Sequence, residues 1–181
     1  MGAHTAVSAA LRRPDGYSGL VLIGPASEGR APDQGELERW DSLADTLESS
    51  GIEAFARAST EDLAGIDPAR RAQIAAAVKR RMAAHGDLGA VSRAIREVPR
   101  SIPFQGMEAL GALRLPVLVI GSRDELDPGH PLAVAKAWAE AIPDADLVVE
   151  GAGESPIAWR GNRVCDLVDA FLERRVAGNP G

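Results

Sequence analysis

The chain has 181 residues, of which 45% are hydrophobic, and its formal net charge is −6 at pH 7. This length and hydrophobic fraction suit a single globular domain with a substantial core and exclude a disordered chain. The acidic balance and the scattered arginine pairs exclude a nucleic-acid partner, and the lack of a long apolar run excludes a membrane span, so we expect a cytoplasmic protein.

The opening of the chain predicts a helix followed by a buried strand. Residues 1–13 are small and helix-tolerant, and the apolar run 19–23 that follows is closed by a Gly-Pro pair. Two further apolar runs, 117–120 and 147–149, also end at glycine-containing turns. Because the apolar character is continuous rather than alternating, we expect strands that are covered on both faces, as in a parallel sheet.

Helices are predicted between and after these strands. Segment 131–142 has one apolar stripe and a proline at its start, which suits a right-handed crossover between the second and third strands. The last helix, over about 162–176, repeats apolar residues at helical spacing. It contains Cys165, which we predict to be a small core residue. A single cysteine excludes an internal disulfide and a multi-cysteine metal site.

An insertion of about eighty residues between the first and second strands has no strand signal. Three amphipathic stripes predict three helices there, which we interpret as an inserted helical cap. The predicted fold class is α/β, with a parallel sheet of about three strands, flanking helices and this cap. Within one structural domain, the chain divides into an opening helix and strand at 1–30, the cap at 31–112, and the rest of the α/β core at 113–181.

The order of elements and two loop motifs resemble the C-terminal half of the α/β-hydrolase fold. Residues 121–128 match the G-x-x-D-x-x-x-P setting in which that family carries its triad acid. Residues Met1, Gly2 and Ala3 fit the three positions after the serine of a G-x-S-x-G nucleophile elbow. The resemblance therefore implies a partial α/β-hydrolase fold that begins just after the nucleophilic serine.

The resemblance also implies site residues. Asp124 takes the place of the triad acid, and the backbone N–H of Met1 takes a place in the oxyanion hole. Asp127 is the weaker candidate for the acid because it directly precedes Pro128. Where the family usually has G-x-G-H after its last strand, this chain has Glu154 in the histidine position. A carboxylate is a poor base for serine at its ordinary pKa.

Three histidines are candidates for the missing base. His130 lies at the rim where the active sites of open α/β sheets are found, and it is either the substitute base or a cap before the following helix. His4 belongs to the first turn of the elbow helix, close to the expected site. His85 is most simply a favourable charge near a helix C-terminus.

The family resemblance implies an enzyme that hydrolyses an ester, amide or similar bond of a small-molecule substrate by a serine mechanism. The sequence contains no phosphate-binding, dinucleotide-binding or metal-binding motif, so we expect no cofactor and no metal. Lacking the serine, this chain is expected to be inactive alone. The alternative is a non-catalytic hydrolase-like module that binds a small apolar ligand or a protein partner. If earlier strands are missing, the strand at 19–23 presents an unpaired apolar edge through which the chain self-associates.

Overall fold

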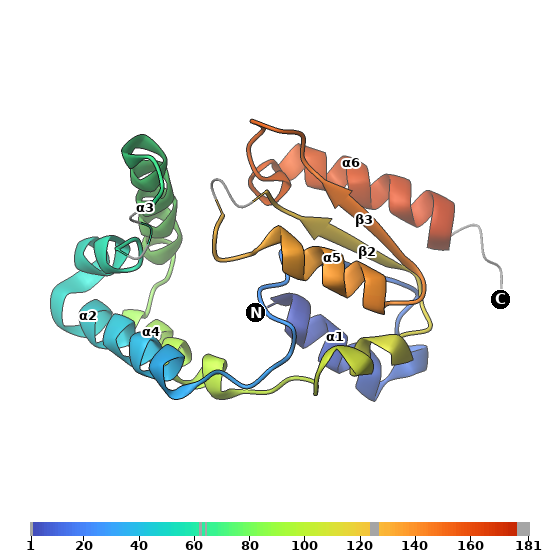
Figure 1. Ribbon diagram of the computed structural model, residues 1–181, viewed down its shortest axis with the longest axis horizontal. Coiled ribbons are helices and arrows are strands. Elements are labelled where there is room, and N and C mark those ends of the chain that lie inside the picture. Colours follow the sequence, from blue (N-terminus) through green and yellow to red (C-terminus); the bar gives the residue numbers. More distant parts are fainter. Residues whose placement is uncertain (1, 62, 64, 124–126, 177–181) are drawn as a thin grey trace. The chain divides into compact units, whose positions relative to one another are not determined.

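A computed structural model describes residues 2–61, 63, 65–123 and 127–176. The chain divides into two compact units, each with its own buried apolar cluster. The core unit consists of Met1–Arg30 and Pro103–Gly181, and the helical unit consists of Ala31–Ile102 (Figure 1).

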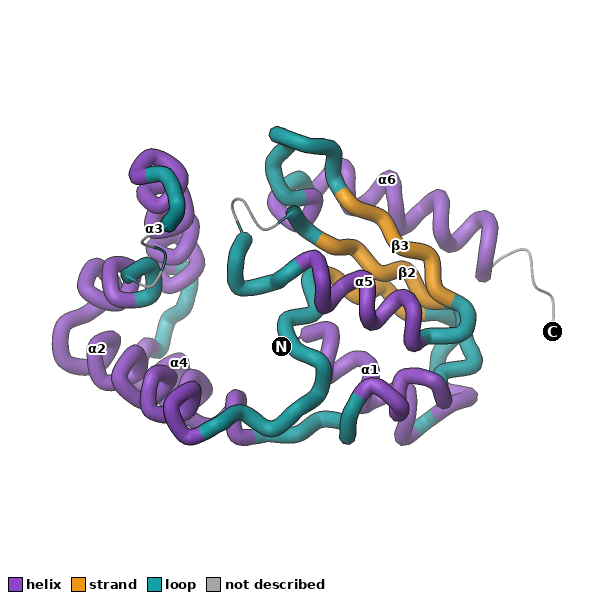
Figure 2. The backbone as a smooth tube through the Cα atoms, in the orientation of Figure 1, coloured by secondary structure: helices purple, strands orange, loops and turns teal. Residues whose placement is uncertain are grey.

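The core unit is built on a parallel sheet (Figure 2). Its strands, in spatial order, are β1 (Leu20–Ile23), β2 (Val117–Gly121) and β3 (Ala145–Val149). All five residues of β2 are buried, because this strand is central and has a neighbour on each side. The predicted α/β class and the parallel sheet of three strands are confirmed. Among the described residues β1 pairs with β2 alone, and its Ile23 is 37% exposed.

Helices cover both faces of this sheet (Figure 1). On one face, α1 (Gly2–Arg12) and α5 (Leu132–Ala141) pack in a single cluster with Val117 and Val119 of β2. On the other face, Leu118 and Ile120 pack with residues of α6 (Gly161–Phe171). Successive side chains of a strand point to opposite faces, so a strand covered on both sides reads as a continuous apolar run.

The prediction that Cys165 is a core residue is wrong, because its side chain is exposed. Helix α6 faces the sheet with Val164, Leu167 and Phe171, which are spaced by three and four residues. One residue turns a helix by about 100°, so Cys165 points away from the stripe that Val164 begins. The helix continues as a π-helical turn over Leu172–Val176, in which Leu172 is 42% exposed.

The helical unit contains three helices whose first turns are fixed by aspartate caps. They are α2 (Gln34–Ala58), α3 (Pro68–Ala83) and α4 (Leu88–Glu97). Asp33 forms a capping box with Glu36, while Asp67 and Asp87 accept hydrogen bonds from backbone N–H groups of the turns that they begin. Gly51, at φ 77°, kinks α2. No helix in the described part of the chain is long and apolar enough to cross a membrane.

Helix α4 is held on α2 by polar contacts as well as by apolar packing. The fully buried hydroxyl of Ser92 donates a hydrogen bond of 2.9 Å to the carbonyl of Ala44. Arg96 donates to Ser92 Oγ at 2.8 Å and forms ion pairs with Asp45 and Glu48 of α2. These contacts fix the register of α4 on α2, because the Ser92 hydroxyl and the Arg96 guanidinium of α4 both have partners on α2.

Gly121 marks a close approach between the end of β2 and helix α5. A Cβ atom at this position would lie 2.9 Å from Ala135 Cβ and 3.1 Å from Leu132 Cδ1. We therefore expect Gly121→Ala to lower the free energy of unfolding by about 1–3 kcal/mol through overpacking. Urea denaturation measures this change. Gly161→Ala is the control, since a Cβ there meets nothing within 4 Å. Equal stabilities of the two variants would contradict the expected overpacking.

Candidate functional site

The candidate site lies at the carboxyl edge of the sheet, where the loops that follow the three parallel strands meet. The loop after β1 contains Gly24 and Ser27, and the loop after β2 contains Asp127 and His130. The loop after β3 contains Glu154. Asp124 and Met1, which the family resemblance implies as acid and oxyanion donor, lie outside the described residues.

His130 forms a pair with Asp127. Its Nδ1 lies 2.8 Å from Asp127 Oδ1, and both side chains are partly buried. A carboxylate partner favours a proton on Nδ1, which leaves Nε2 as the acceptor that a general base needs. Gly24 makes room for the ring, because a Cβ atom at this position would lie 3.2 Å from His130 Cγ. His130 thus contacts Asp127, which sequence reasoning considered the weaker candidate for the triad acid.

His4 lies in an aromatic setting beside Ser27. Its Nε2 is 3.0 Å from Ser27 Oγ and 3.3 Å from the Ser27 carbonyl oxygen. The ring stacks on Phe104 and meets the edge of Trp138 at a centroid distance of 4.9 Å. Trp138 Nε1 donates a hydrogen bond of 2.9 Å to the same Ser27 carbonyl. Sequence reasoning missed this pairing, because 23 residues separate His4 from Ser27 and no local pattern connects them.

Burial lowers the pKa of His4 below its ordinary value of 6.5, and the positive charges of the N-terminal amino group and, to a smaller extent, of His130 lower it further. The hydrogen bond to the Ser27 carbonyl acts in the opposite direction. The net lowering keeps His4 neutral near pH 7, so its ring can pack among aromatic side chains without a desolvated charge.

This lowered pKa predicts a pH-dependent stability. Around and below pH 6.5 the unfolded chain binds a proton at His4 more readily than the folded protein does, so the free energy of unfolding falls as the pH is lowered through this window. We expect His4→Gln to reduce the loss of stability between about pH 7.5 and about pH 5.5, measured by urea unfolding. His85→Gln, at an exposed histidine, is expected to keep the wild-type slope. An unchanged slope in His4→Gln contradicts the assignment.

A buried carboxylate at the end of β3 anchors the loop that leads to Asp127. Glu150 is 4% exposed, and its Oε1 accepts hydrogen bonds from the Ser122 hydroxyl, at 3.1 Å, and from the Arg123 backbone N–H. Arg123 Nε donates to the Glu150 carbonyl at 3.1 Å. Sequence reasoning missed Glu150. The available signal was an acidic residue placed directly after a buried apolar run.

Glu154, in the position of the family's histidine, is exposed and engaged in its own loop. Its Oε2 accepts a hydrogen bond of 3.0 Å from the Gly151 N–H and forms an ion pair with Arg160 at 3.3 Å. The hydrogen bond from the Gly151 N–H and the charge of Arg160 lower the pKa of the Glu154 carboxyl. A lower pKa makes the carboxylate a weaker base, so the histidines are better candidates for the general base.

Among residues 2–61, 63, 65–123 and 127–176, no group of three or more His, Cys, Asp or Glu side chains could hold a metal ion.

No protein-family model matches the chain, and no curated protein sequence matches it either. Solved structures do match its fold. An enol-lactonase from Burkholderia xenovorans matches with 22% identity and a TM-score of 0.65, over 96% of this chain and 63% of the enzyme. A thermophilic esterase from Thermogutta terrifontis matches with 20% identity and a TM-score of 0.67, over 96% of this chain and 62% of the esterase.

A third solved structure is described as an α/β-hydrolase enzyme from a deep-sea metagenome library of the Medee basin. It matches with 16% identity and a TM-score of 0.66, over 96% of this chain and 62% of its own length. The chain thus spans less than two thirds of each of these proteins, and at these identities the likeness is one of fold. Over the part of that fold which it spans, this chain has the α/β-hydrolase fold.

Proposed function

We propose that the whole protein is a hydrolase that cleaves an ester, amide or similar bond through a serine nucleophile, with His130 as general base and Asp127 as the carboxylate that orients it. The observation that carries this proposal is the 2.8 Å contact between His130 Nδ1 and Asp127 Oδ1 at the carboxyl edge of the sheet. The likeness in fold to an esterase and an enol-lactonase supports the reaction class. Asp127 takes the role that the family motif gives to Asp124, because Asp127 contacts the base.

In the proposed reaction, the serine oxygen attacks the carbonyl carbon of the substrate while its proton passes to His130 Nε2. Asp127 accepts the Nδ1–H hydrogen bond and stabilises the imidazolium that forms. His130 then gives the proton to the leaving group as the acyl-enzyme is formed. Water attacks this intermediate, with His130 again as base, and releases the acid product and the free serine. The Met1 N–H is the proposed oxyanion donor.

The proposed nucleophile is a serine outside residues 1–181, because none of the serines in this sequence lies in a G-x-S-x-G turn. In the proposed longer product this serine directly precedes Met1, and the helical unit, Ala31–Ile102, acts as a substrate-selecting cap. Residues 1–181 alone are then inactive. The side of β1 that has no strand partner among the described residues is the proposed surface for self-association of this isolated part.

Expression from the native locus with its upstream DNA tests the proposal. We expect an intact mass well above 19.0 kDa, and a fluorophosphonate adduct on a serine that immediately precedes Met1. Peptide mapping locates the adduct. An adduct on Ser27 would show that the nucleophile is assigned wrongly. A product of 19.0 kDa that resists the probe and turns over no activated ester would favour the non-catalytic binding module instead.

A further inference from the structure

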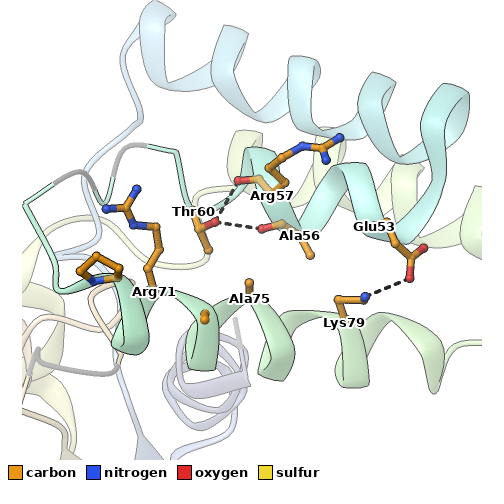
Figure 3. A pocket seen from close by; sticks show the side chains of 9 residues that line it. Glu53, Ala56, Arg57, Thr60, Arg71, Ala75 and Lys79 are labelled. Carbon is orange, nitrogen blue, oxygen red and sulfur yellow. Dashed lines mark hydrogen bonds and ion pairs between the residues drawn. The ribbon is translucent and has the colours of Figure 1, made fainter.

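The helical unit contains a shallow pocket of about 450 Å³, open to solvent, between the second half of α2 and helix α3 (Figure 3). Both walls of the pocket belong to this unit. Its apolar wall is made of short side chains, Ala56 from α2 and Ala72 and Ala75 from α3. Alanines leave space between two helices where longer side chains would fill it.

Charge in this pocket is unbalanced. Three cations line it, Arg57, Arg71 and Lys79, against the single carboxylate of Glu53. That carboxylate is already engaged, because Glu53 Oε1 lies 3.1 Å from Lys79 Nζ. Within the described part of the chain, no carboxylate forms an ion pair with Arg57 or Arg71. This excess of positive charge stands out in a chain whose formal net charge is −6.

Arg71 is the residue in this pocket best prepared for an anion. Its Nη2 donates a hydrogen bond of 3.3 Å to the Ile66 carbonyl, which holds the guanidinium at one end of the pocket, near Thr60 (Figure 3). Its Nε is buried and has no hydrogen-bond partner among the described residues. A buried donor without a partner is costly, and the planar guanidinium matches a carboxylate with two parallel hydrogen bonds. A carboxylate bound against this guanidinium would give its Nε an acceptor and remove this cost.

We propose that this pocket binds a small organic anion, namely a carboxylate on a short hydrocarbon chain. The carboxylate pairs with Arg71, and the hydrocarbon lies along Ala72 and Ala75 toward Lys79. Arg71 and Lys79 are two helical turns apart on α3, or about 12 Å, which accommodates such a chain. The proposal concerns the helical unit alone and does not depend on the hydrolase reaction proposed above.

Titration of the full chain with sodium hexanoate at constant ionic strength tests the proposal, with backbone amide shifts as the readout. We expect saturable shifts at the residues that line the pocket, and binding at least about tenfold weaker in Arg71→Gln, which loses the charge-assisted hydrogen bonds from the guanidinium to the carboxylate. Arg70→Gln is the matched control, because Arg70 is the exposed neighbour on the same helix and does not line the pocket. It is expected to bind as the wild type does.

Two further ligands and one further variant separate the contribution of the negative charge to binding from that of the hydrocarbon chain. Hexanol and inorganic phosphate are each expected to bind about tenfold more weakly than hexanoate, since each supplies one of the two contacts. Ala75→Leu fills the pocket without changing its charge, and it is expected to abolish hexanoate binding. This variant also tests the site if Arg71→Gln fails to fold. The proposal is overturned by absence of saturable hexanoate binding, by equal effects of Arg71→Gln and Arg70→Gln, or by phosphate binding as tightly as hexanoate.

Discussion

Replacing His130 by alanine in the full-length protein is expected to lower kcat/KM for an activated ester by about 10²–10⁴-fold. The reason is the loss of the group that takes the proton from serine, which Asp127 holds in place through a 2.8 Å contact to Nδ1. Steady-state hydrolysis of a p-nitrophenyl ester measures the effect. His130 is partly buried rather than part of a core cluster, so the variant is expected to remain folded.

Two comparisons decide whether this loss reflects a catalytic base. Asp127→Asn should also reduce kcat, because an amide cannot stabilise the imidazolium, while substrate binding and KM change little. His85→Ala, at an exposed position of the helical unit, is expected to keep wild-type kinetics. If His4→Ala rather than His130→Ala abolishes turnover, then His4 is the base and the assignment of His130 is wrong.

The three strands were predictable because the sheet is covered on both faces. Val117 and Val119 pack on one side of β2, and Leu118 and Ile120 on the other, so the strand appears in the sequence as an unbroken apolar run. The start of β3 was not predictable in this way. This edge strand includes Asp146, whose carboxylate pairs with Arg175 at 3.0 Å. Because a charged residue interrupts the apolar pattern, the first two residues of the strand were not predicted.

The candidate site was predictable only where the chain brings its residues together locally. Asp127 and His130 are three residues apart in the sequence and contact each other across one turn. The family motif instead predicted Asp124 as the acid. The contact between His4 and Ser27 depends on how α1 packs against the sheet, which no local spacing encodes. Tertiary packing, rather than propensity, decides which polar side chains meet at the carboxyl edge.

Trp138 connects this edge to the core, and Trp138→Ala is expected to lower the free energy of unfolding by about 3–5 kcal/mol. The side chain is 0% exposed, and its removal leaves a cavity in the main apolar cluster. It also removes the edge contacts with His4 and with Phe104, at centroid distances of 4.9 Å and 5.4 Å. The Ser27 carbonyl loses the hydrogen bond from Nε1. Urea unfolding followed by far-UV circular dichroism measures the change.

Two substitutions separate the causes of this effect. Trp159→Ala, at a position that is 43% exposed, is expected to change stability by no more than about 1 kcal/mol. Trp138→Phe keeps much of the volume but removes the Nε1–H donor, so it isolates the hydrogen bond to the Ser27 carbonyl at about 1–3 kcal/mol. Similar losses in Trp138→Ala and Trp159→Ala would contradict the central place of Trp138 in the core. A large loss in Trp138→Phe would show that the hydrogen bond, more than packing, fixes the loop that carries Ser27.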